Sequence, residues 1–285
     1  MKLSNISVLI TTIMLFSALS GFCQDKEELV ENIGNGGINW TSGIIRAVGI
    51  GAPPENLYGK PEARPMALRA AQIDAYRNLL EVVQGVRIQS STMVKNFMVE
   101  DDSISAQVSG MVQGAQVANK EYFDDGTVEV TLEMNLKGGF AQLVLPQDIK
   151  QVEPIKGTPP ASSGDKTKKS SSDSFTGLVV DARGLNAKPA MSPRIIDENG
   201  QEIYGAAYVS REYAVQQGVS GYSKNMDSAV SNERVTNNPM IVKGITTAGP
   251  GKSDIMISNS EASKLKGSPE NLAFMKQCRT IIVVD

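Results

Sequence analysis

The sequence predicts an α+β protein of two small domains, each an antiparallel or mixed sheet with packed helices, joined by a flexible linker. Three observations lead to this prediction. Residues 127–136 alternate apolar and polar side chains, which is typical of a strand with one buried face. Residues 65–84 repeat apolar side chains at helical spacing. Residues 152–174 are rich in Pro, Ser, Gly and Lys and hold almost nothing to bury, so they predict the linker.

The N-terminus predicts export. Lys2 is followed by an apolar run over residues 6–16, which is too short to span a bilayer as a helix, and then by small residues. We therefore interpret residues 1–23 as a signal peptide. Two outcomes stay open at Cys23: simple cleavage, or lipidation of Cys23 as the first residue of a lipoprotein. Lipidation requires a small residue before the cysteine, and Phe22 is bulky, which favours simple cleavage.

The first domain is predicted over residues 38–148, after a lead-in at 24–37 that we expect to be mobile. An apolar run over 40–50 predicts a strand, and Asp124-Asp125-Gly126 predicts a hairpin turn before the alternating strand. The other predicted elements are the helix at 65–84, a strand at 86–94, a short helix at 103–111 and the first hairpin strand at 113–123.

The long helix carries an apolar stripe that predicts which of its faces is buried. The residues at spacings of three and four are Met66, Ala70, Ile73, Tyr76, Leu80 and Val83. We expect this stripe to pack on the sheet, and Gly85 to end the helix.

The second domain is predicted over residues 175–285, after a linker at 149–174. Asn199-Gly200 is a strong hairpin signal, and Ser268-Pro269 is typical of a helix N-terminus. The predicted strands are 176–182, 194–198, 202–207, 240–247, 254–258 and 280–284, and the predicted helices are 210–217, 226–231 and 269–277.

Composition excludes several classes of function. A net charge of −3, spread along the chain, gives no electrostatic case for nucleic-acid binding. The chain contains no histidine, which excludes Ser-His-Asp and Cys-His catalysis and most zinc sites. A carboxylate-only enzyme or a Ser-Lys pair stays open, but we expect no catalytic residues, no cofactor and no metal. Cys278 precedes an apolar strand and is expected to be a small buried hydrophobic side chain.

Three motifs are candidate sites. Residues 49–54 (GIGAPP) resemble a phosphate loop, but the two prolines remove backbone N–H donors, so a structural turn is favoured. The acidic pairs are Asp101 with Asp102 and Asp124 with Asp125. They could act as acid and base in a hydrolase only if the fold brought their carboxylates together. Capping of a helix and formation of a turn are the favoured roles. The third candidate is a ligand-binding site formed by Asp181, Arg183 and Arg211. A local ion pair between Asp181 and Arg183 is the simpler interpretation.

The first domain resembles the LPP20 family of bacterial envelope lipoproteins and the related flagellar outer-membrane and basal-disc assembly proteins. The resemblance rests on residues 45–54 (IRAVGIGAPP), on 63–64 and 70–81 (AAQIDAYRNLLE), on 83–86, 108–110 and 114–115, and on 125–128. It implies a non-enzymatic envelope protein, often part of a larger assembly and in some members needed for motility. It implies no catalytic residues.

The sequence thus predicts an exported protein in the periplasm or on the periplasmic face of the outer membrane. We expect it to act as an assembly or scaffold component, with other envelope proteins or its own copies as partners, close to the outer membrane or peptidoglycan. Two alternatives stay open: a periplasmic ligand- or peptidoglycan-binding module, and a carboxylate-dependent hydrolase.

Overall fold

The computed structural model describes residues 27–149, here called the first half, and residues 175–285, the second half. Both halves combine sheets with helices, so the α+β prediction is confirmed. The signal peptide, Cys23 and nearly all of the predicted linker lie outside the described residues. No described helix is both long and apolar enough to cross a membrane.

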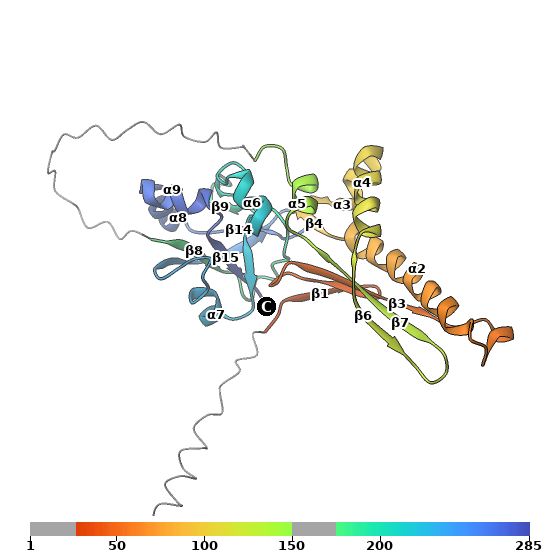
Figure 1. The fold of residues 1–285 in the computed structure, drawn as a ribbon. Coiled ribbons are helices and arrows are strands. Elements are labelled where there is room, and N and C mark those ends of the chain that lie inside the picture. The colour runs from red at the N-terminus through yellow and green to blue at the C-terminus, as the bar shows by residue number, and fades with distance from the viewer. Residues whose placement is uncertain (1–26, 150–174) are drawn as a thin grey trace, which may run out of the picture.

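The first half is a five-stranded antiparallel sheet covered by one long helix (Figure 1). Its strands are β1 (Val30–Ile33), β2 (Gly36–Asn39), β3 (Ile44–Gly51), β6 (Gln116–Tyr122) and β7 (Val128–Asn135), in the order β1-β2-β3-β7-β6. The helices are the 3₁₀ turn η1 (Glu55–Leu57), α2 (Ala63–Gln84), α3 (Val94–Glu100), α4 (Asp102–Gln113) and α5 (Gly139–Val144). A small hairpin is formed by β4 (Arg87–Gln89) and β5 (Thr92–Met93).

The sheet begins earlier than the sequence predicted. Residues 24–37 were expected to be a mobile lead-in, but β1 and the first two residues of β2 lie in this segment. β1 pairs with β2, and β2 pairs with β3. The prediction was therefore wrong for residues 30–37. Alternation of side chains is hard to recognise here because Gly36 and Gly37 carry no side chain.

The buried face of α2 is the opposite of the predicted one. Met66 and Ile73 of the predicted stripe are 47% and 54% exposed, whereas an alanine row faces the sheet. The buried residues of the helix are Ala63, Ala67, Ala71, Ala75, Asn78, Leu79, Val82 and Val83. Of the predicted stripe, Val83 is fully buried, and Tyr76 and Leu80 are half-buried against the core.

Glycines on β3 explain why the alanine row is buried. A Cβ atom at Gly49 would lie 2.0 Å from the backbone nitrogen of Ala75, and one at Gly51 would lie 2.2 Å from the carbonyl oxygen of Ala67. Helix and strand therefore touch backbone to backbone, and only small side chains fit between them. The phosphate-loop comparison is replaced by this packing role, because both glycines belong to β3.

The second half contains two four-stranded sheets. In one, all strands are parallel in the order β11-β15-β8-β12: β8 (Gly177–Asp181), β11 (Gly221–Ser223), β12 (Pro239–Lys243) and β15 (Thr280–Val283). The other is mixed, in the order β10-β9-β14-β13: β9 (Ile195–Ile196), β10 (Glu202–Tyr204), β13 (Thr246–Ala248) and β14 (Asp254–Met256). The helices are α6 (Arg211–Gln217), α7 (Met226–Val230), α8 (Asn259–Lys266) and α9 (Pro269–Lys276).

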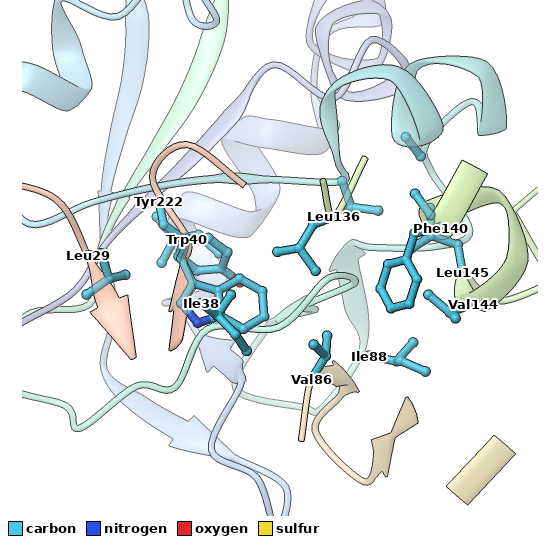
Figure 2. Close-up of a cluster of buried hydrophobic side chains, with 14 of the residues drawn as sticks. Leu29, Ile38, Trp40, Val86, Ile88, Leu136, Phe140, Val144, Leu145 and Tyr222 are labelled. Carbon is cyan, nitrogen blue, oxygen red and sulfur yellow. The ribbon is translucent and has the colours of Figure 1, made fainter. Parts of the chain in front are cut away.

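The two halves share one hydrophobic core. Figure 2 shows part of it, where Trp40 of the first half lies against Tyr222 of the second, with ring centroids 5.8 Å apart. Backbone hydrogen bonds also cross between the halves, from Met191 N to Arg87 O (2.9 Å) and from Ser192 N to Ile88 O (2.8 Å). The sequence predicted two domains on a tether, and the structure places them in direct contact.

Substituting alanine for Gly49 tests the close approach of β3 and α2. Because the new Cβ would overlap helix backbone, we expect Gly49→Ala to lower the free energy of unfolding by about 1–3 kcal/mol or more. Urea denaturation monitored by circular dichroism measures this change.

Gly110→Ala is the matched control for that experiment. Gly110 lies in α4, and apart from the adjoining helix backbone no atom lies within 4 Å of an added Cβ. Alanine there should stabilise the protein by about 0.5–1 kcal/mol. Equal effects of the two substitutions would contradict the close-packing account.

Candidate functional site

The predicted ligand residues Asp181 and Arg183 lie at the carboxyl end of β8, the edge at which open parallel sheets bind ligands. Arg183 Nε and Nη2 each donate to the Asp181 carboxylate at 2.8 Å. These hydrogen bonds lower the pKa of Asp181. Close by, the Gly184 N–H donates a hydrogen bond to the Asp285 carboxylate at 2.7 Å. The local ion pair is therefore confirmed, and its polar atoms already satisfy one another.

Arg211, the third predicted ligand residue, has a different role. Its guanidinium group donates to the carbonyl oxygens of Pro146 (2.9 Å) and Gln142 (2.8 Å). Both acceptors belong to the first half, whereas Arg211 opens α6 in the second. Arg211 thus connects the two halves, and its contact with a ligand stays a prediction.

The acidic pairs have the local roles that the sequence favoured. Asp101 caps α4, accepting hydrogen bonds from Ser103 N (2.7 Å) and Ile104 N (3.3 Å). Asp125 accepts from Thr127 N (2.9 Å) in the β6–β7 turn, and this hydrogen bond lowers its pKa. Among the described residues, no group of three or more metal-ligating side chains is placed to hold a metal ion.

A further candidate surface is the side of the first sheet that α2 does not cover, here called the open face. The residues that point to this side are Val30, Asn32, Ile44, Arg46, Val48, Ile50, Glu129, Thr131 and Glu133. Ile50 is 58% exposed and Val30 is 48% exposed. Apolar side chains therefore reach solvent at both ends of the open face.

The open face combines these apolar side chains with an excess of acidic groups. Arg46 Nε pairs with Glu133 Oε2 at 2.9 Å, which leaves Glu129 without a basic partner among the described ion pairs. Glu121 of the edge strand β6 lies directly opposite Glu129, a like-charge pair that is unfavourable in an isolated sheet. A basic group from a partner would relieve this repulsion.

A shallow hollow of about 300 Å³ lies on the open face over β1, β2 and β3. Gly37 contributes no side chain to it, and a Cβ there would lie 2.9 Å from the Glu31 carbonyl oxygen. Val30, Ile44 and Val48 supply apolar lining. Sequence reasoning missed this surface because β1 and β2 were not predicted. The side chains of Ile44, Val48 and Ile50, which share one side of a strand, were available as a signal.

The second half is similar to a known protein family. Residues 177–285, less than half of the chain, match the family model that describes the second domain of Treponema pallidum Tp0624. No match was found among curated proteins.

Cys278, the one cysteine among the described residues, is fully buried as predicted. Burial raises the pKa of its thiol to about 12, so at pH 8 the thiol stays protonated and unreactive. In a C23S variant, we expect no native-state reaction with Ellman's reagent at pH 8. In denaturing urea one thiol per chain should react, and prompt labelling of the native protein would contradict this burial.

Proposed function

We propose that this chain is a non-enzymatic, exported cell-envelope protein that acts as an assembly or scaffold component by docking a partner protein on its open face. The observation that carries the proposal is the two-layer construction of the first half. One sheet face is covered by α2, while the other presents Val30, Val48 and Ile50 together with unpaired acidic groups. Exposed apolar side chains bordered by polar and charged ones are typical of a docking site.

The chemistry of the open face specifies the partner. Glu121 and Glu129 favour a surface that carries lysine or arginine, because the acids repel each other in the isolated sheet. The hollow at Gly37 favours an inserted apolar side chain. A second copy docked face to face would bring acids against acids, so we propose a different protein rather than a homodimer at this surface.

The cell envelope part of the proposal is supported by the sequence. The signal peptide predicted over 1–23 directs the chain out of the cytoplasm, to the periplasm or the periplasmic face of the outer membrane. The resemblance of the first half to the LPP20 family extends the proposal to assemblies that include flagellar ones. The match of the second half to a domain of a Treponema pallidum protein supports no particular activity.

A charge placed on the open face tests the docking proposal. Ile50→Lys replaces an exposed apolar side chain by a cation and should reduce recovery of the partner by at least about tenfold, because the ammonium group would be buried in the interface. The measurement is chemical crosslinking in intact cells, followed by affinity capture of the tagged chain and mass spectrometry.

Val99→Lys is the control for this experiment. Val99 lies on α3, away from the open face, and is 86% exposed, so the same change of charge should leave recovery unaltered. A wild-type chain that is recovered without any crosslinked partner would contradict the proposal, as would equal recovery with Ile50→Lys.

A deletion strain separates the flagellar branch from a general envelope role. Loss of swimming together with a missing ring density in tomograms of the flagellar base would support flagellar assembly. Normal swimming with intact bases would rule that branch out and leave the docking proposal to be judged by crosslinking.

A further inference from the structure

A cavity between the two halves is bounded by side chains from both. It has a volume of about 40 Å³, room for roughly three water-sized groups. Its apolar wall includes Trp40, Leu136, Leu145, Met191, Ala214 and Tyr222. Several of these side chains are seen together in Figure 2. None of the predicted ligand residues Asp181, Arg183 and Arg211 lines it.

Lys137 brings a positive charge to this cavity. Its stem crosses Gly43, where an added Cβ would lie 2.9 Å from Lys137 Cε, and Gly43 has a φ of +78° that favours glycine. The Lys137 amino group donates to the Ser42 carbonyl oxygen at 3.2 Å. None of the ion pairs among the described residues includes Lys137.

Arg234 is a second cation, which lies outside the cavity and contacts residues that line it. Its guanidinium donates to the carbonyl oxygens of Cys278 (2.7 Å), Gln217 (2.8 Å) and Gly218 (2.5 Å), and two of these acceptors belong to cavity residues. It also pairs with no carboxylate in the described part of the chain. Burial and the charge of Arg234 lower the pKa of Lys137, so the site favours an added negative charge.

A hydrogen-bond donor is available beside these charges. The hydroxyl of Ser220, a cavity residue, is buried and has no partner with hydrogen-bond geometry, although it lies close enough to the Tyr222 hydroxyl to lower the pKa of that group. A buried polar group without a partner costs about 1–3 kcal/mol, which a ligand that accepts its hydrogen bond would recover. The cavity thus offers the Lys137 cation, the buried Ser220 hydroxyl and an apolar wall.

We propose that the junction cavity binds a carboxylate carried on a short apolar stem, with Lys137 as counter-ion and Ser220 as hydrogen-bond donor. The three heavy atoms of a carboxylate match the space, and the apolar wall contacts the adjoining carbon atoms. The carboxylate belongs either to a small free acid or to the C-terminus of a peptide. This site is independent of the open face and of the docking function proposed for it.

The fluorescence of Trp40 reports directly on the cavity, because Trp40 lines it and is the only tryptophan in the chain. The full-length protein is titrated with butyrate and with acetyl-Ala-Ala at constant ionic strength. Butyramide and acetyl-Ala-Ala-amide serve as uncharged controls. We expect a saturable change of emission with one or both acids and none with the amides.

Lys137→Met keeps the stem and removes the charge, and it should weaken binding of the acid at least tenfold. Lys120→Met, on the exposed edge strand, is the matched control and should bind as the wild type does. Ser220→Ala, which deletes only a hydroxyl, should weaken binding about threefold and keeps the test informative if Lys137→Met unfolds.

The two ligands distinguish the sources. Binding of butyrate identifies a small free acid, whereas binding of the peptide acid alone identifies a chain terminus. The proposal is overturned if neither acid gives a saturable change, if the amides bind equally well, or if the folded Lys137→Met and Ser220→Ala variants bind like the wild type.

Discussion

The hydrogen bonding of residues 87–90 to the second half is the interaction on which the rest of the structure depends. This short segment follows α2 and accepts backbone hydrogen bonds from Met191 and Ser192. The Ser90 carbonyl oxygen also accepts from Gly251 N at 2.7 Å, and an added Cβ at Gly251 would lie 2.3 Å from that oxygen. The two backbones are therefore held too close for side chains to intervene.

The position of Trp40 and the cavity beside it follow from that contact. Arg87 forms an ion pair with Glu31, and its Nε donates a hydrogen bond to the Pro189 carbonyl oxygen at 2.9 Å. The Glu31 carboxylate also accepts a hydrogen bond from Trp40 Nε1 at 3.0 Å. One arginine thus connects β1, β4 and the second half. Trp40 is fixed against Tyr222, and the space left beside the two rings becomes the cavity with Lys137 at its wall.

Local features could be predicted from the sequence, whereas features that depend on distant partners could not. The Asp101 cap, the Asp125 turn and the Asp181–Arg183 pair each involve residues two or three positions apart. The buried face of α2 was predicted wrongly because hydrophobicity favours Met66 and Ile73. The glycines of β3 instead require alanines on the facing side. Periodicity cannot show which of two apolar stripes meets a partner of complementary size.

The site shows the same division. The residues 181 and 183 were identified from a local motif, but Lys137, Ser220 and Trp40 are far apart in the sequence and meet only where the halves join. The chain order also gave no indication that β11, β15, β8 and β12 form a parallel sheet. Composition and periodicity could not predict that the two halves bury side chains against each other.

The most direct test of the account is urea unfolding followed in one sample by Trp40 fluorescence and by far-ultraviolet circular dichroism. Trp40 reports the junction alone, whereas circular dichroism reports the helices and strands of both halves. Because the halves share one core, we expect the two signals to change in a single transition with the same midpoint. An early fluorescence change that leaves most of the circular dichroism intact would contradict the account, since the junction would then open while each half stays folded.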